Sequence, residues 1–210
     1  MMTERRLDWE TAFASCPLVA ILRGITPDAA VEAVEVIASG FRLIEIPLNS
    51  PDALDSIQRV AATAGERAVL GVGTVLNPAA VAAVRDASGR LIVAPNFDPR
   101  VTAASAESGI IYGPGVGTLT EAFAALEAGV AFLKLFPAEA ILPEAVKAMR
   151  AVLPRATRLL TVGGITPEAM SRYRAGAGGG LRTGLGALSV RRRAARTCAS
   201  GAAVHGGTVD

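Results

Sequence analysis

The amino-acid sequence predicts an α/β fold, a (β/α)8 TIM barrel, with residues 1–180 as a single domain. Two observations predict it: seven short apolar runs recur along the chain, and Ala-rich segments with helical spacing separate them at intervals of about 22 to 25 residues. Parallel strands joined by helical crossovers produce this alternation. A closed barrel is favoured over an open doubly wound sheet, because no GxGxxG motif opens a helix after the first strand.

The expected strands are rich in Val, Leu and Ile, which fit a parallel sheet that is covered on both faces. They are residues 18–22, 42–46, 68–72, 91–94, 109–113, 131–136 and 159–162. An eighth strand is expected after residue 175.

Most of the expected helices open with Ser, Thr, Asp or Asn followed by Pro, the usual N-cap and first-turn pair. They are residues 26–38, 50–62, 77–87, 98–108, 118–128, 142–152 and 166–175. Gly40, Gly109 and Gly129 fall where helices should end, in the left-handed conformation that glycine adopts readily. No Pro- or Ser-rich linker divides the chain, so these elements belong to one domain.

Composition excludes several classes of function. The 210 residues are 51% hydrophobic but only 4% aromatic, and the net charge is +2. A basic face with interleaved aromatic residues is missing from this pattern, so nucleic-acid binding is not expected. No apolar stretch has the length of a membrane span, and the charged first ten residues do not resemble a signal peptide. A cytoplasmic protein without a membrane partner is expected.

Metal and cofactor chemistry is not expected either. Cys16 and Cys198 form no CxxC or metal-ligand spacing and fit reduced thiols, and the single histidine, His205, lies in a glycine-rich segment. Catalysis that depends on a central histidine, or on a histidine-bound metal, therefore lacks its usual residue.

Lys134 is the most informative residue, because it interrupts the apolar run AFLKLFP. Burial lowers the pKa of a lysine and yields a neutral amine that can attack a carbonyl group, as in Schiff-base catalysis. A lysine at a strand end can instead extend to solvent or pair with a carboxylate.

Other polar or special residues follow the ends of other expected strands. Glu45 stands in the apolar strand RLIEI, where burial would raise its pKa towards the range useful for proton transfer. Arg23 can bind a carboxylate or phosphate, while Thr74, Pro95 and the pair 163–164 can shape a pocket. Each has an ordinary alternative, such as a surface ion pair for Arg23. In a barrel, all would meet at the carboxyl end of the strands.

Together these segments resemble a known family. VAILRGITPDAA, GFRLIEIPLNSP, GVGTVLNP, LIVAPNFD, PGVGTLTEAFAALEAG, FLKLFPAE and TVGGITPE are similar, in order, to the strand-end motifs of the class I 2-keto-3-deoxy-6-phosphogluconate and 6-phosphogalactonate aldolases. The resemblance covers residues 17–179. It implies a TIM barrel, a phosphorylated keto sugar acid as substrate, no cofactor and a homotrimer.

The resemblance also implies roles for individual residues. Lys134 would be the Schiff-base lysine and Glu45 the general acid and base. Arg23 and Thr74 would bind the keto acid, and the backbone at Gly163 and Gly164 would contact the phosphate. The expected substrate-binding residues are therefore Arg23, Thr74, Pro95, Val162, Gly163 and Gly164.

Two positions favour the galactonate branch of this family. Gluconate-type members usually carry an arginine-containing stretch where this chain has IPLNS with Asn49, and a threonine where it has Val162. A threonine hydroxyl could hydrogen-bond a substrate hydroxyl, which valine cannot do. The expected substrate is 2-dehydro-3-deoxy-6-phosphogalactonate, with the gluconate-type aldolase as the alternative.

Residues 181–210 depart from the resemblance. They contain no Lys or Glu, have poor helical periodicity and are rich in Gly, where the family continues with a phosphate-binding turn and a helix. A frameshift near residue 179 would explain this, because a reading frame shifted by one base can encode the family-like peptide AFGLGSALY. The alternatives are a divergent tail, with the eighth unit and the C-terminal helix disrupted, and a phosphate-binding barrel that has lost catalysis. A thiamine-phosphate synthase relative lacks support, because its pyrophosphate and metal-binding motifs are not evident.

Overall fold

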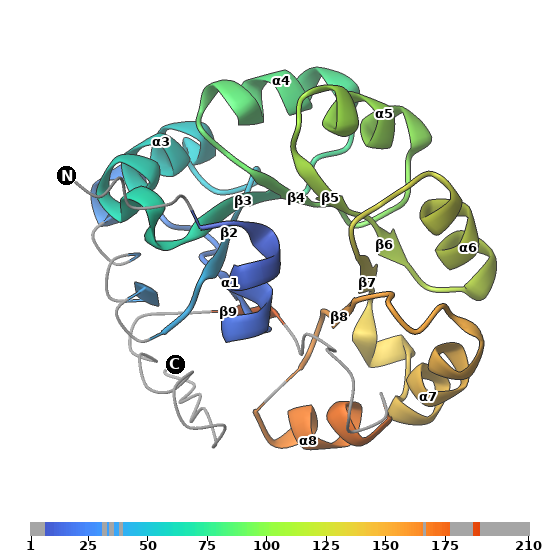
Figure 1. Ribbon diagram of the computed structural model, residues 1–210. Coiled ribbons are helices and arrows are strands. Elements are labelled where there is room, and N and C mark those ends of the chain that lie inside the picture. The colour runs from blue at the N-terminus through green and yellow to red at the C-terminus, as the bar shows by residue number, and fades with distance from the viewer. Residues whose placement is uncertain are drawn as a thin grey trace.

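A computed structural model describes residues 7–30, 33, 36–37, 40–165, 167–176 and 187–189 of the chain. Its strands form a ring with helices on the outside, so the α/β barrel predicted from the sequence is confirmed (Figure 1). The strands are β1 (Val19–Ile21), β2 (Leu43–Pro47), β3 (Val69–Gly73), β4 (Leu91–Val93), β5 (Ile111–Gly113), β6 (Gly115–Val116), β7 (Leu133–Leu135), β8 (Leu159–Thr161) and β9 (Ala187–Ser189). All seven apolar runs contain a strand.

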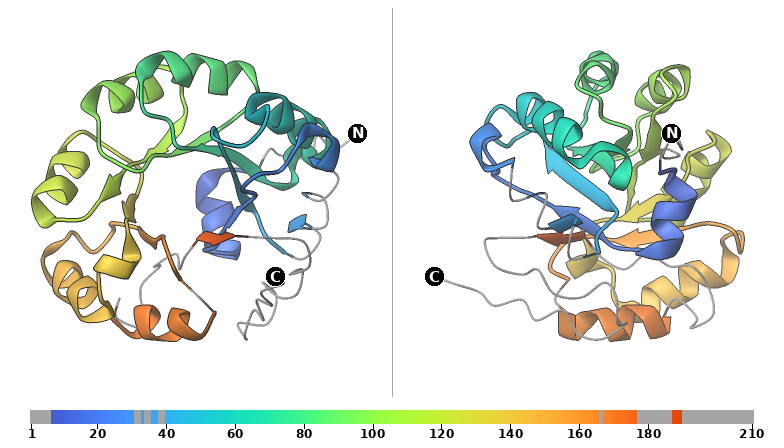
Figure 2. Two further views of the ribbon diagram at one scale, coloured as in Figure 1. Left: turned by 180° about the vertical axis from the view of Figure 1, so that it is seen from behind. Right: turned by 60° about the vertical axis from the view of Figure 1, so that its left-hand side comes forward.

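The helices follow the strands in the expected alternation, and α4 and α5 lie across the ring from α7 and α8 (Figure 2). They are α1 (Trp9–Ser15), α3 (Ala53–Ala64), α4 (Pro78–Asp86), α5 (Pro99–Glu107), α6 (Leu119–Glu127), α7 (Pro143–Val152) and α8 (Pro167–Gly176). Short 3-10 helices are η1 (Pro27–Ala30), η2 (Gly65–Arg67) and η3 (Ala138–Ala140). The helix expected over 26–38 lies partly outside the described residues.

Three predicted helix starts, at Asn77, Asp98 and Thr118, are confirmed by side-chain caps. Asn77 accepts a hydrogen bond from the N–H of Ala80, and Thr118 forms a capping box with Glu121. Ser50 was expected to cap the helix after β2, and this is wrong: α3 begins later, and the Ser50 Oγ accepts a hydrogen bond from the loop after β1. The predicted left-handed helix ends at Gly40, Gly109 and Gly129 are confirmed by their φ angles of 106°, 65° and 83°.

The strands are all parallel, in the order β5-β4-β3-β2-β1-β9 and β6-β7-β8. Pro114 separates β5 from β6, which are two halves of the fifth barrel strand; its carbonyl still accepts a hydrogen bond from the Lys134 N–H at 2.8 Å. β9 pairs with β1, with Ala187 opposite Val19, and so takes the position of the expected eighth strand. Within the described ranges, no ladder joins β8 to β9.

Alternate strand residues face the barrel interior, as the period of two in a strand requires. Residues such as Ile44 and Leu133 face the helices, whereas their neighbours point inward. The inward-facing apolar cluster comprises Trp9, Ala12, Phe13, Val19, Ile21, Leu43, Val69, Leu91, Val93, Phe132, Leu160 and Val162. Three members of this cluster come from α1, which therefore belongs to the barrel interior.

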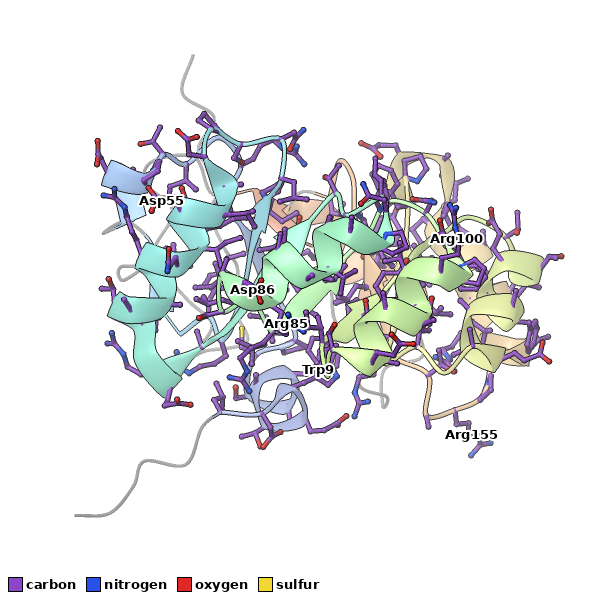
Figure 3. All side chains as sticks on the ribbon, turned by 90° about the horizontal axis from the view of Figure 1, so that it is seen from above. Trp9, Asp55, Arg85, Asp86, Arg100 and Arg155 are labelled. Atoms are coloured by element: carbon purple, nitrogen blue, oxygen red, sulfur yellow. The ribbon has the colours of Figure 1, made fainter. Side chains whose placement is uncertain are left out.

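Helix α1 was not predicted from the sequence, and it closes one end of the barrel. The Asp8 carboxylate caps it, and Trp9 stacks on Phe132 with ring centroids 4.7 Å apart. In Figure 3, Trp9 lies towards one end of the molecule, while Asp55 and Arg100, at the starts of α3 and α5, lie towards the other. Helix α1 therefore covers the amino end of the described strands (Figure 3).

Two further expectations concern other features of the chain. Cys16 is buried and is not a free thiol, so the expectation of a reduced cysteine is wrong for this residue; Cys198 lies outside the described residues. In the part of the chain that the structure describes, no helix is both long and apolar enough to cross a bilayer.

Candidate active site

Lys134 is held inside the barrel by its position in β7. Its neighbours Leu133 and Leu135 face the helices, so the Lys134 side chain points inward, and the residue is only 7% exposed. The Nζ atom lies 4.5 Å from the centroid of the Phe136 ring. The apolar surroundings favour the neutral amine, and burial lowers the pKa of Lys134.

Glu45 reaches the same interior from β2. It is 3% exposed, and among the described residues its Oε2 atom has no hydrogen-bond partner. Burial is the main cause that raises the pKa of this carboxyl group from 4.5 to about 7, against the opposing effect of the positive charges of Lys134 and Arg23. A carboxyl group with this pKa can both accept and donate a proton near neutral pH.

The two buried groups influence each other electrostatically. The Glu45 carboxylate raises the pKa of Lys134, but burial outweighs this effect, and the Arg23 charge lowers the pKa further. A buried amine and a buried carboxyl group therefore lie close enough in the barrel interior to interact, with the Arg23 cation nearby. This combination is typical of sites that act on carbonyl compounds.

Arg23 lies in the loop after β1 and is exposed at the carboxyl end of the barrel. Its Nη1 donates a hydrogen bond to the Asn49 Oδ1 at 3.3 Å, and the N–H of the adjacent Gly24 donates to the Ser50 Oγ at 3.0 Å. These two contacts fix the loop after β1 against the loop after β2. Among the described residues, the other guanidinium nitrogens of Arg23 form no hydrogen bond and can bind an anionic group.

Thr74 and Pro95 follow the ends of β3 and β4. Thr74 has a φ of 64°, although its side chain is branched at Cβ, and its N–H donates to the Val93 carbonyl at 3.2 Å. Such a residue is a genuine conformational outlier, and strain of this kind concentrates at functional sites. Pro95 is half-buried, and its carbonyl lies so close to Gly115 that a side chain there would overlap it.

Val162, Gly163 and Gly164 follow β8. Val162 is buried in the inward-facing cluster, its N–H donates to the Leu135 carbonyl at 3.0 Å, and its carbonyl accepts from the Ala138 N–H at 2.8 Å. Gly163 and Gly164 have φ angles of 106° and 57°. Successive backbone amides in such a turn can form a concave site for an anion.

The structure therefore brings the predicted residues to one end of the barrel, where Lys134, Glu45 and Val162 are buried and Arg23 and Gly164 are exposed. Sequence reasoning missed Phe136, which contacts the lysine. Its position two residues after Lys134 in FLKLF was the available signal, because it places both side chains on one face of the strand.

Comparisons of the sequence and of the structure with known proteins point to the same family. A family model for KDPG and KHG aldolases matches residues 10–186. The chain is 43% identical over 198 residues to the 2-dehydro-3-deoxy-6-phosphogalactonate aldolase of Escherichia coli (strain K12), which covers 92% of this chain and 95% of that protein. A solved structure described as native KDPGal has a TM-score of 0.78 and 42% identity, and the match covers 82% of each chain.

A second similar solved structure is a designed assembly. It is a cube-shaped, highly porous protein cage designed by fusing symmetric oligomeric domains. The match has a TM-score of 0.76 and 44% identity, and it covers 81% of this chain and 63% of that one.

Proposed function

Because the chain belongs to the KDPG and KHG aldolase family, we propose that it is a class I aldolase that cleaves 2-dehydro-3-deoxy-6-phosphogalactonate to pyruvate and glyceraldehyde 3-phosphate. The observation that carries this proposal is the pair Lys134 and Glu45, both buried in the barrel interior and each shifting the pKa of the other. Imine formation needs a neutral amine as nucleophile and a group that transfers protons. The buried Lys134 amine and the Glu45 carboxyl group, with a pKa of about 7, meet these two needs.

The first half of the reaction uses Lys134. Its neutral amine adds to the C2 keto group to form a carbinolamine, and loss of water then gives a protonated imine. Removal of the proton from the C4 hydroxyl group allows the C3–C4 bond to break. The bonding electrons move into the imine, so glyceraldehyde 3-phosphate leaves and an enamine of pyruvate remains on Lys134.

Glu45 moves the protons in these steps. It takes a proton during addition of the amine, helps water to leave, and accepts the C4 hydroxyl proton directly or through a water molecule. The enamine is then protonated at C3, and hydrolysis releases pyruvate and restores the amine. A pKa of about 7 lets the same carboxyl group alternate between these roles.

The other residues at the carboxyl end of the strands bind the substrate. Arg23, oriented by Asn49, pairs with the keto-acid carboxylate. Thr74 and Pro95 shape the pocket around this group, and the N–H groups of the turn 163–164 contact the phosphate. With these contacts, the carbon chain of the substrate extends from Lys134 in the barrel interior to the phosphate at the carboxyl end of the strands.

The galacto epimer is supported by Val162, which presents no hydroxyl group to the substrate, and by the 43% identity to the E. coli protein. The gluconate epimer is the alternative. Cleavage rates of the two epimers, compared as kcat/KM, decide between them. A higher value for the gluconate epimer would reverse the assignment.

The central test is reduction with borohydride in the presence of pyruvate, followed by peptide mapping. We expect a covalent adduct on Lys134, loss of the adduct and of cleavage activity in Lys134→Arg, and retention of both in Lys147→Arg, which alters an exposed lysine of α7. EDTA should not reduce activity. An adduct that persists in Lys134→Arg, or full turnover in that variant, would refute the mechanism.

A homotrimer is proposed as the assembly. Leu119 and Phe123 lie one turn apart on α6 and are exposed, Phe123 by 46%, which is unusual for side chains of this size. The similar domain in the designed cage comes from a symmetric oligomer. Light scattering should give a trimer mass for the parent and a smaller mass for Phe123→Asp, with Glu127→Asp on the same helix as control; a monomeric parent would contradict the proposal.

The C-terminal segment, residues 181–210, is proposed to result from a frameshift near residue 179. The proposal is supported by the composition of this segment, which contains no Lys or Glu and is rich in Gly. The family model match continues to residue 186, seven residues past the proposed position. Resequencing of the gene and mass spectrometry of the C-terminal peptide test this origin. If the written sequence is correct, substrate binding without cleavage or imine trapping would instead identify a barrel that has lost catalysis.

We place the protein in the cytoplasm, where phosphorylated sugar acids are made and kept. Cell fractionation tests the location, and alkylation of thiols at lysis tests the redox state that it implies. A Cys16 that remains oxidised under those conditions would argue against the cytoplasm, where disulfides are rare.

A further inference from the structure

One carboxylate lies where the substrate phosphate is expected. Glu139, on η3, packs against the glycine pair: a Cβ added to Gly163 would lie 2.5 Å from the Glu139 Oε2, and one added to Gly164 would lie 2.7 Å from its Oε1. The Glu139 side chain therefore extends along both glycines. A side chain at either position would push the Glu139 carboxylate away from this place.

The backbone around Glu139 is held firmly. The Ala138 N–H donates to the Val162 carbonyl at 2.8 Å, and the buried Tyr173 donates from its hydroxyl to the Ala138 carbonyl at 3.0 Å. These contacts join η3 to the turn after β8 and to α8. The position of Glu139 beside the glycine pair is thus set by the fold, while its exposed side chain remains able to rotate.

The charge of Glu139 is not neutralised in this position. Within the described residues, no Lys or Arg forms an ion pair with it. In the same part of the chain, neither the Gly163 N–H nor the Gly164 N–H donates a hydrogen bond to another described residue. A carboxylate therefore stands next to two uncommitted donors that can attract an anion.

We propose that Glu139 is a specificity-determining residue that competes with the substrate phosphate for the glycine pair 163–164. The proposal rests on the proposed function, because it requires the phosphate to bind there. Two anions cannot occupy this turn together without strong repulsion, so the carboxylate swings outward when a phosphate enters. Displacement of the carboxylate therefore weakens the binding of phosphorylated ligands. It does not affect the binding of pyruvate, which carries no phosphate.

The test is the dissociation constant of inorganic phosphate, measured by calorimetry on the full chain. Glu139→Gln should bind phosphate about fivefold more tightly than the parent, as expected when a nearby like charge is removed. Glu144→Gln, in the exposed first turn of α7, removes the same charge from a neighbouring position and should leave the constant unchanged. Equal or weaker binding in Glu139→Gln, or an equal gain in Glu144→Gln, would overturn the proposal.

A second measurement separates this proposal from the aldolase assignment. With the phosphorylated substrate, Glu139→Gln should lower KM more than it changes kcat, whereas pyruvate imine trapping reports on Lys134 alone. Trapping on Lys134 without any change in phosphate affinity would leave the aldolase intact and refute the role of Glu139. A change in phosphate affinity without trapping would support Glu139 and refute the aldolase. Adding Gly163→Ala to Glu139→Gln should abolish the gain, because its methyl group narrows the turn.

Discussion

The carboxyl group of Glu45 fills the space that any side chain at Gly73 would need. A Cβ on Gly73 would overlap the Glu45 Oε1, and the two residues lie on the paired strands β2 and β3. The missing side chain of Gly73 therefore leaves room for the Glu45 carboxyl group inside the barrel. The position of the proposed proton-transfer group depends on this contact.

Gly73→Ala should displace the Glu45 carboxyl group and lower kcat by about 100-fold, the usual contribution of a positioned acid or base. Gly71→Ala is the matched control, since its Cβ would meet Leu91 at 3.0 Å and not Glu45. Both variants should lose stability, but only Gly73→Ala should shift the pH profile of kcat. An unchanged profile in Gly73→Ala would show that the glycine does not position Glu45.

The pH dependence of kcat/KM should rise through the pKa of Glu45, about 7, and then level off. The ionised carboxylate is the form that accepts the C4 hydroxyl proton, so activity falls on the acid side. The measurement is a profile of kcat/KM from pH 5 to pH 9, with Glu45→Gln as the reference. An inflection near pH 4.5 in the parent would contradict a buried Glu45 in the active form.

Glu45 should also make stability depend on pH. Its pKa is about 7 in the folded protein and 4.5 when exposed, so the folded state binds the proton more tightly. Its contribution to stability is complete below pH 4.5 and is lost as the pH rises through 7, by about 3 kcal/mol in total. The free energy of unfolding, measured by urea denaturation, should therefore favour Glu45→Gln over the parent increasingly between pH 4.5 and pH 8. A difference between the two proteins that does not change with pH would contradict this prediction.

Val162→Thr should move the epimer preference towards the gluconate substrate by about tenfold in the ratio of kcat/KM values, because a hydroxyl group at this position can bond the substrate. The buried hydroxyl should also cost about 1 to 2 kcal/mol of stability without substrate. Val162→Ala controls for lost volume and should weaken both epimers alike. A ratio that stays constant in Val162→Thr would exclude Val162 from epimer selection.

Thr74→Asn should stabilise the protein by about 1 kcal/mol, since asparagine adopts a positive φ more easily than a branched residue. It should raise KM if Thr74 has its proposed place in the keto-acid pocket, because the shape of that pocket changes. Ser88→Asn, at a φ of 67° after α4, is a control that should change stability without changing KM. A more stable Thr74→Asn with unaltered KM would remove Thr74 from the binding site.

The repetitive part of the fold could be predicted from the sequence because its signals are local. Apolar runs such as LVAIL and RLIEI contain strands, and Gly40 and Gly109 end helices as predicted. The depth of Lys134 and Glu45 was also predictable, because each interrupts an apolar strand. These conclusions need only strand periodicity and the cost of burying a charge.

The remaining features depend on contacts between distant segments. Ser50 looked like a helix cap, but its hydroxyl accepts a hydrogen bond from Gly24, which the sequence alone does not place nearby. The proximity of Glu139 to the glycine pair arises from the docking of η3 on the turn after β8. Helix α1 was missed because seven residues give little periodicity, and its role depends on the Phe132 ring beneath Trp9.

Helix α1 has a consequence for access to the barrel interior. Trp9 and Phe13 pack in the inward-facing cluster, so aromatic rings fill the amino end of the described strands. In the proposed reaction, both products would then depart through the carboxyl end of the strands. Glyceraldehyde 3-phosphate would depart first and pyruvate last, because pyruvate stays covalently bonded to Lys134 until hydrolysis.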